Sequence, residues 1–287
     1  MAPAILLADT VTRLGGEHAG NVLVSGSHGG IIAAAYAAQA RVRAAIFNDA
    51  GRGRDDAGVA GLAALERIGI AACAVAHTSA RIGDAADAFA HGIVSTCNAA
   101  AAAAGAAPGM RCDDAAAQLR AAPWSKELLA FPAESRALLA PASEGRSPVW
   151  GLDSIGLVEA TDAGAVLVIG SHGALHGGDP ASALPVAARA AFFHDAGRGS
   201  GDANVSRLPV LAARGMPAAA VDFRSARIGD ARSLWETGAL SVANAPAAAL
   251  GIVPGMRVRD AAVRLRQATY GRKGSDADRA ESGSPGV

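Results

Sequence analysis

The chain contains little lysine, and several catalytic and cofactor-binding motifs are missing from it. Lysine occurs only at Lys126 and Lys273, which argues against a Schiff-base lysine, a pyridoxal enzyme and a Walker-type phosphate loop. No predicted strand is followed by Gly-x-Gly-x-x-Gly, the usual dinucleotide fingerprint. The Gly-x-Ser-x-Gly nucleophile elbow lacks its first glycine, which is replaced by Ser25 and Ile169 at the two candidate places. An ordinary α/β-hydrolase is therefore disfavoured.

Cysteine is also scarce, and no segment resembles a targeting signal or a membrane span. Cys73, Cys97 and Cys112 form no close pair of the Cys-x-x-Cys kind. We therefore predict a reduced, cytoplasmic protein in which Cys73 and Cys97 are small buried thiols within strands. The first residues lack the basic n-region of a signal peptide, and no apolar run is long enough to cross a bilayer.

Neither sign of charge is in excess. The chain has 26 basic and 26 acidic residues, and no Lys/Arg-rich run marks a nucleic-acid footprint or a membrane-surface helix. We expect neither a nucleic acid nor a membrane as partner. A length of 287 residues suits two domains, each long enough to bury its own core.

Three motifs occur twice in the same order. They are Gly-Ser-His-Gly at 26–29 and 170–173, Asp-Ala-Gly-Arg-Gly at 49–53 and 195–199, and Ser-Ala-Arg-Ile-Gly-Asp-Ala at 79–85 and 225–231. The offset is 144 residues at the first motif and 146 at the others, so the second copy has two extra residues between His172 and Asp195. We therefore predict a tandem duplication.

Short apolar runs alternate with helical segments inside each copy. In the first copy the predicted strands are 21–25, 44–48, 70–76 and 93–97, and the predicted helices are 31–40, 57–68, 85–91 and 99–104. This alternation predicts an α/β fold of two tandem, doubly wound, Rossmann-like units, each with a parallel sheet. The predicted divisions are 1–121 for the first repeat, 122–147 for a linker or connecting arm, 148–270 for the second repeat and 271–287 for a disordered tail.

Each motif directly follows a predicted strand, so the three should meet at the carboxyl edge of a sheet, where open parallel sheets bind ligands near a change in strand order. The serine and second glycine of the first motif suit an anion cradle at the start of a helix; these residues are Ser27, Gly29, Ser171 and Gly173. The alternative is a tight turn in which the serine caps the helix. His28 and His172 are predicted to be functional, because a cap needs no imidazole.

The second motif places a carboxylate at a strand tip. Asp49 and Asp195 suit a base, a metal ligand or a group that orients a histidine. Each is followed by an arginine, Arg52 or Arg198, which suits anion binding or a local ion pair with the aspartate. Seven residues further on, Asp56 and Asp202 are predicted to be helix N-caps.

The third motif offers a guanidinium that suits a carboxylate or phosphate. The predicted binding residues are Ser79, Arg81, Ser225 and Arg227. The alternative for each arginine is an ion pair with Asp84 or Asp230, which are predicted to be helix N-caps. Asn98 and Asn244 end the fourth strand of each copy, and a cap is favoured for them too.

The copies differ at other polar positions. Asn48, Ala76, His77 and Thr78 become His194, Asp222, Phe223 and Arg224 in the second copy, which also gains His176. The second half therefore has more potential bases, and we place the working site there, or at a junction to which Ser27, His28 and Asp49 contribute. A divalent metal on His172 or His194 with Asp195 is conceivable, but the spacing matches no compact signature, and no cofactor is predicted.

The leading hypothesis is an enzyme that hydrolyses an amide, ester or related acyl bond of a small anionic metabolite. In it His172 or His194 is the general base, Asp195 orients that base, and Ser27 or Ser171 is the nucleophile if the reaction is covalent. A lyase or isomerase on the same site is an alternative. Others are a non-catalytic protein whose two lobes close on a small anion and a structural role in a homo-oligomer.

Overall fold

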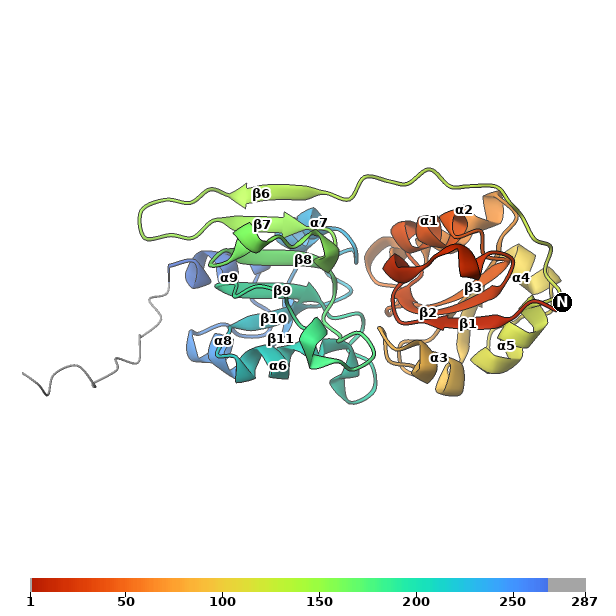
Figure 1. Ribbon diagram of the computed structural model, residues 1–287. Helices are drawn as coiled ribbons and strands as arrows, with labels where there is room; N and C mark the ends of the chain where they lie inside the picture. Colours follow the sequence, from red (N-terminus) through yellow and green to blue (C-terminus); the bar gives the residue numbers. More distant parts are fainter. Residues whose placement is uncertain (1, 268–287) are drawn as a thin grey trace, which may run out of the picture.

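The computed structural model describes residues 2–267 and contains two lobes, each built on one β-sheet interleaved with helices (Figure 1). We call residues 2–121 the first lobe, 122–147 the arm and 148–267 the second lobe. The predicted tail at 271–287 lies outside the described residues. The protein is thus a mixed α/β protein with a five-stranded and a six-stranded sheet.

The strands of the first sheet are paired in chain order. Strands β1 to β4 are parallel to their neighbours, and β5 runs antiparallel to β4. The predicted parallel sheet is therefore confirmed for β1 to β4 but not for β5, and the expected change in strand order is absent from this sheet. The strands are β1 (Ile5–Ala8), β2 (Val22–His28), β3 (Ala44–Asn48), β4 (Ala71–Val75) and β5 (Val94–Cys97).

Helices cover both faces of the first sheet, because its strands are apolar on both sides. Val22 and Val24 pack on one face with α3, α4 and α5, while Leu23 and Phe47 pack on the other with α1 and α2. The helices are α1 (Ile31–Gln39), α2 (Ala60–Arg67), α3 (Ala85–His91), α4 (Ala99–Ala103) and α5 (Cys112–Leu119), with 3-10 turns η1 (Val11–Arg13), η2 (Gly16–His18) and η3 (Arg54–Asp56).

The second sheet repeats this order and adds one strand from the arm. Strand β6 lies antiparallel against β7 at the edge of the sheet (Figure 1). Strands β7 to β10 are parallel, as predicted, whereas β11 is antiparallel to β10. The strands are β6 (Arg136–Ala140), β7 (Val149–Leu152), β8 (Val166–His172), β9 (Ala190–His194), β10 (Ala218–Val221) and β11 (Leu240–Ala243).

The segment between β8 and β9 differs from its counterpart in the first lobe. It has no α-helix where α1 stands, and it contains only the turn η6 (Pro180–Ser182). This is the segment with the two extra residues. The helices of this lobe are α6 (Arg207–Ala213), α7 (Ala231–Thr237), α8 (Ala245–Ala249) and α9 (Val258–Leu265), with η4 (Ile155–Leu157), η5 (Ala160–Asp162) and η7 (Ser200–Val205).

The two lobes meet through the loops that follow the carboxyl ends of their strands. Ala50 and Ile82 of the first lobe form a buried cluster with Ala174, Ala196 and Ile228 of the second. The Ile82 N–H also donates to the Asn204 side chain across the interface (3.1 Å). Residues of the second and third repeated motifs, and Ala174 directly after the first, therefore lie at this junction.

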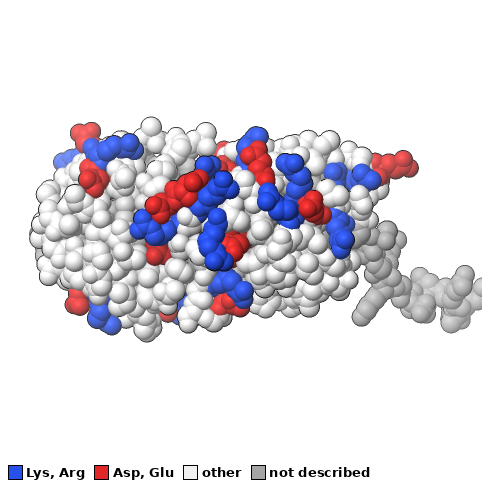
Figure 2. All heavy atoms as spheres, turned by 180° about the vertical axis from the view of Figure 1, so that it is seen from behind, with Lys and Arg blue, Asp and Glu red and all other residues white. Residues whose placement is uncertain are grey.

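The surface carries mixed charge, and no described helix is long and apolar enough to cross a membrane. Figure 2 shows basic and acidic side chains interspersed on one face, with no broad area of a single sign. Several charged side chains of the protein form close ion pairs, such as Arg52 with Asp56 and Arg198 with Asp202.

Candidate functional site

The carboxylate of Asp195 directly follows β9 at the carboxyl edge of the second sheet. One of its oxygens accepts hydrogen bonds from the backbone N–H groups of Gly197 and Phe223, both at 3.0 Å. The Ser241 hydroxyl, which donates to the Ala220 carbonyl (3.3 Å), lies nearby and acts to lower the pKa of Asp195. Burial nevertheless outweighs these bonds and raises the pKa of Asp195 to about 6. A carboxyl group with this pKa can both accept and release a proton near neutral pH.

A cavity of about 530 Å³ opens beside Asp195. Arg198, Arg224 and Ser225 also line it. Each arginine uses two nitrogens in a bond to an aspartate, Arg198 to Asp202 and Arg224 to Asp222. The Nη1 atom of each guanidinium keeps its hydrogens free, since no described residue accepts them. The cavity thus combines a titratable carboxyl group with cationic donors.

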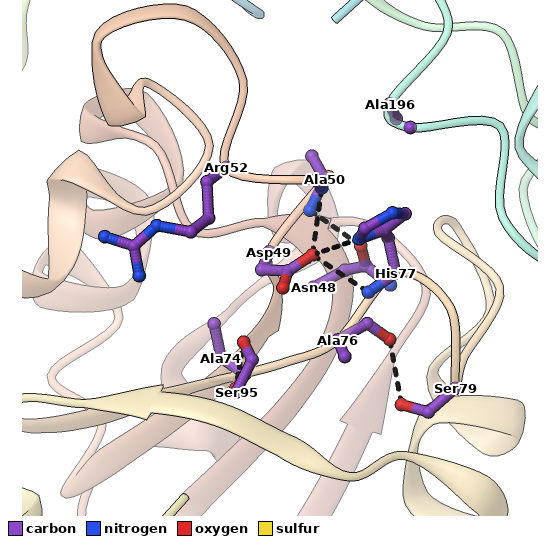
Figure 3. A network of polar contacts seen from close by, with 12 residues as sticks. Asn48, Asp49, Ala50, Arg52, Ala74, Ala76, His77, Ser79, Ser95 and Ala196 are labelled. Atoms are coloured by element: carbon purple, nitrogen blue, oxygen red, sulfur yellow. Dashed lines mark hydrogen bonds and ion pairs between the residues drawn. The ribbon is translucent and has the colours of Figure 1, made fainter. Parts of the chain in front are cut away.

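The matching carboxylate of the first lobe, Asp49, is hydrogen-bonded to a histidine. Its Oδ1 atom accepts from the N–H groups of Gly51 (2.9 Å) and His77 (2.8 Å), and it lies 3.0 Å from the His77 ring Nδ1. In Figure 3 the His77 ring faces Asp49, while the Arg52 side chain points away from both. Although burial acts in the opposite direction, the bonds to His77 and Gly51 hold the pKa of Asp49 below its usual value.

Phe223 stands at the position of His77 in the second lobe, and its ring cannot hydrogen-bond to a carboxylate as the imidazole does. The two rings are instead in contact with each other across the interface, with centroids 6.1 Å apart. Asp195 consequently has no imidazole partner, although its position in the sheet matches that of Asp49. This difference explains why the pKa of Asp195 is raised and that of Asp49 is lowered.

The histidines of the first motif end their strands and are neutral. The Nδ1 atom of His28 accepts the N–H of Gly30 (3.2 Å), and that of His172 accepts the N–H of Ala174 (3.3 Å). The proton of each ring is therefore on Nε2. Burial lowers the pKa of His28 to about 4 and that of His172 well below its usual value. Neutral imidazoles of this kind are donors at neutral pH.

Both ring nitrogens of His194 take part in the fold. Its Nδ1 accepts the N–H of Ala196 (3.1 Å), and its Nε2 lies 3.2 Å from the Ala226 carbonyl. Asn48 makes the same two bonds at the matching position of the first lobe, to Ala50 (2.9 Å) and Ala80 (3.1 Å). His194 has no exposed surface, and burial lowers its pKa to about 4. The ring therefore anchors two loops and does not face the cavity beside Asp195.

A buried arginine that the sequence analysis did not single out supports the segment after His172. Arg207 has no exposed surface, and its guanidinium donates to the carbonyls of Ser182 and Ala183. Its Nη2 lies 3.4 Å from the His176 ring, and its Nε has no partner among the described residues. Burial lowers its pKa to about 10. Arg207 holds the loop that replaces α1 in this lobe.

The serines and glycines of the first motif form hydrogen bonds with backbone groups. The Ser27 hydroxyl accepts the N–H of Val11 (3.1 Å), and Ser171 accepts that of Ile155 (3.2 Å). The N–H groups of the two glycines extend the sheets by donating to the residue that ends the neighbouring strand. Gly29 donates to Asn48 and Gly173 to His194. Neither glycine therefore offers a free N–H to an anion, and neither serine caps a helix.

The other predicted binding residues are paired as well. Arg81 lies 2.9 Å from Asp87, and Arg227 lies 2.7 Å from Asp55 of the opposite lobe. The hydroxyls of the third motif close their own loops: Ser79 donates to Ala76, and Ser225 donates to Asp222. Arg227 links the two lobes through Asp55, and Ser225 links them through its carbonyl, which accepts a hydrogen bond from Arg54 (3.3 Å).

Four predicted helix caps are confirmed. Asp84 and Asp230 cap α3 and α7, and Asn98 and Asn244 cap α4 and α8. Asp56 and Asp202 are not caps, because they lie within 3-10 turns and pair with Arg52 and Arg198. The third-motif aspartates and the asparagines thus stabilise local structure, as expected for short polar side chains that precede helices.

The structure brings only some of the predicted site residues together. Asp195, Arg198 and Ser225 share one cavity, while His28, Ser171 and Arg227 share another between the lobes. Ser241 and the bond between Asp49 and His77 were missed, because both depend on pairing between distant strands. The signal for His77 was the presence of Phe223 at the matching position of the second lobe. Within residues 2–267 no three His, Cys, Asp or Glu side chains are placed to hold a metal ion.

Comparison with known proteins identifies no relative. Neither a scan of family models nor searches of curated proteins and of solved structures produced a match.

Proposed function

We propose that the chain is a hydrolase of an amide, ester or related acyl bond in a small carboxylate-bearing molecule, with its working site beside Asp195. One observation carries the proposal: two matching carboxylates are placed in unequal surroundings. Asp49 is held by His77, whereas Asp195 has no such partner and lines a cavity. A buried carboxyl group with a raised pKa in a cleft is typical of catalytic acids and bases.

In this proposal Asp195 is the general base. It takes a proton from a water molecule as the oxygen attacks the acyl carbon, and it returns that proton to the departing amine or alcohol. The hydrogen bonds from the N–H groups of Gly197 and Phe223 orient the carboxylate. Asp195 takes the role of general base in place of His172 and His194, which the sequence favoured. The Nδ1 atoms of both histidines already accept backbone N–H groups.

The substrate carboxylate would bind to the free Nη1 groups of Arg198 and Arg224, which line the same cavity. The bonds to Asp202 and Asp222 hold both guanidinium groups in place. Fixed guanidinium groups lose little side-chain entropy when they bind an anion. An anionic substrate is therefore preferred to a neutral one.

The test uses p-nitrophenyl esters and p-nitroanilides of succinate and glutarate. With these probes Asp195→Asn should lower kcat about 100-fold or more, the usual effect of losing a general base. The matched control is Asp49→Asn, which should lower the melting temperature but leave kcat unchanged. In the wild type kcat/KM should fall as pH drops below about 6, because Asp195 is then protonated. Full turnover by Asp195→Asn would contradict the proposal.

A non-catalytic protein that binds small anions is the second candidate. The observation in its favour is that both cavity arginines are held by aspartates, an arrangement that binding alone would use. It predicts that the probes raise the melting temperature without being hydrolysed. Asp195→Asn would then leave the affinity unchanged or increase it.

We also infer that the two lobes arose by duplication of one α/β unit. The repeated motifs support this, as does the common order of β1–β5 and β7–β11. Asn98 and Asn244 also make the same four hydrogen bonds to matching backbone atoms. On this inference the cavity beside Asp195 became available when His77 and its match, Phe223, diverged.

A further inference from the structure

A second cavity, of about 370 Å³, lies between the two lobes. His28 and the first residues of α1 line it from the first lobe, and Ser171 and Arg227 line it from the second. Glu134 of the arm completes the wall. Its volume is at the lower end of the range typical of small-molecule sites, about 300–1,000 Å³. The hydrolase site proposed above shares none of these residues.

The matching place on the other side of the junction is filled by the chain itself. There the loop after His172 reaches the first lobe, and the Gly177 N–H donates to the Gly83 carbonyl (2.7 Å). A Cβ atom built on Gly83 would lie 2.6 Å from the Leu175 carbonyl oxygen. On Gly229, the match of Gly83, the nearest atom would be 3.7 Å away, on His28. The loop after His172 therefore fills one of two equivalent spaces, and the other space remains open as the cavity.

Three kinds of hydrogen-bond donor line the open cavity. The Nε2–H of His28 has no partner among the described residues, because only Nδ1 of this largely buried ring is bonded. Helix α1 has no side-chain cap and no acidic residue in its first turn, so its first N–H groups are unpaired and attract negative charge. The Ser171 oxygen accepts one N–H and keeps its own hydrogen to donate. These donors suit a carboxylate.

The rest of the lining supplies mainly acceptors and negative charge. Four carboxylates line the cavity, those of Asp55, Glu134, Asp153 and Asp230, against the single guanidinium of Arg227. Arg227 is bonded to Asp55 (2.7 Å) and lies 3.6 Å from Asp230, but its single positive charge leaves a negative excess among the four carboxylates of the cavity. The Gly229 carbonyl, whose match binds the Gly177 N–H, accepts no hydrogen bond from the described residues. These walls suit a protonated amine, and a ligand with negative charge alone would be repelled.

We propose that this cavity binds a small zwitterion of the α-amino acid class. The carboxylate lies at the start of α1 and accepts from His28 and Ser171. The ammonium group lies near Glu134 and Asp230 and donates to the Gly229 carbonyl, the atom that the inserted loop satisfies in the filled space. The ligand contacts both lobes and the arm, so its binding stabilises their closed arrangement.

The test is calorimetric titration of the full chain with each of the twenty proteinogenic L-amino acids. At least one should bind with a Kd below about 1 mM. Its amide and its des-amino analogue should each bind about tenfold more weakly or worse, because each lacks one charge. Asp195→Asn should bind as the wild type does, which separates this site from the proposed hydrolase site.

Two variants locate the site. Ala60→Leu fills the cavity that Ala60 lines and should weaken binding more than tenfold. The matched control, Ala63→Leu, places the same side chain on an exposed position of α2 and should leave the Kd unchanged. Glu134→Gln removes one negative charge and should weaken binding whether or not Ala60→Leu folds.

Three results would each overturn the proposal. The first is that none of the twenty amino acids binds. The second is that the des-amino analogue binds as well as the amino acid, which would make the ligand a simple anion. The third is that Glu134→Gln leaves the affinity unchanged.

Discussion

Replacing His194 by Asn should make the protein less sensitive to acid while keeping both hydrogen bonds of the lost ring. Asn48 already makes this pair of bonds in the first lobe, with one acceptor for a backbone N–H and one donor to a carbonyl. Asn at 194 should do the same, because the geometry of the strand ends matches. It carries no titratable proton, so the two variants differ in charge only when the imidazole is protonated.

The magnitude follows from the pKa of His194, which burial lowers from 6.5 to about 4. The folded state holds this ring neutral, so its contribution to stability is complete above about pH 6.5 and is lost as the pH falls towards 4. At about pH 5 most unfolded chains carry the extra proton and few folded chains do, which lowers the free energy of unfolding by about 2 kcal/mol. The smaller side chain should lower stability by about 1 kcal/mol at every pH, since it fills less space.

The assay is urea unfolding of both proteins at about pH 7 and about pH 5. The wild type should lose about 2 kcal/mol more between the two conditions than His194→Asn does. His28 and His176, whose pKa values are also lowered to about 4, act in the same direction, and Asp195, whose pKa is raised, acts in the opposite one. Their effects cancel in the comparison. Equal losses in the two proteins would refute the reasoning.

Two further predictions each concern two residues, the first two equivalent glycines and the second two neighbouring cysteines. Gly83→Ala should destabilise the protein by about 2 kcal/mol more than Gly229→Ala in thermal melts, because both glycines have positive φ but only Gly83 has a carbonyl oxygen in the way; equal losses would contradict this. Oxidised glutathione should link Cys73 to Cys97, whose sulfurs lie 2.8 Å apart on paired strands, releasing two molecules of glutathione and lowering the protein mass by about 2 Da. Cys97→Ala should abolish the change, and an unchanged wild-type mass would refute it.

Local sequence signals predicted most of the elements but not the arrangement of the strands. Strand β3 and helix α3 lie where the pattern placed them, because a buried strand and a capped helix both have strong local signals. Strands β1 and β7 were missed, since each has four residues and gains its identity from pairing with a neighbour. The antiparallel direction of β5 and β11 was missed for the same reason.

The location of the candidate site could be predicted from the sequence, but the contacts of its residues could not. The sequence analysis expected the motifs at the carboxyl edge and preferred the second half, where Asp195 lines a cavity. It could not show that His194 and Asn48 make equivalent bonds, because that depends on loops more than thirty residues away. Nor could it place Arg207 in the interior, since a charged residue without an acidic partner is rarely buried.

The chain-order pairing of the first sheet bears on how the protein is made. The first lobe has all its strands once β5 has left the ribosome, and a domain of this kind folds as a unit during synthesis. Its side of the junction, where Ala50 and Ile82 are fully buried in the finished protein, has no cover until the loop that carries Ile228 is made. At usual rates of translation the roughly one hundred residues still to come take about 5–20 s. For that time the nascent chain presents an apolar surface that the finished protein never shows.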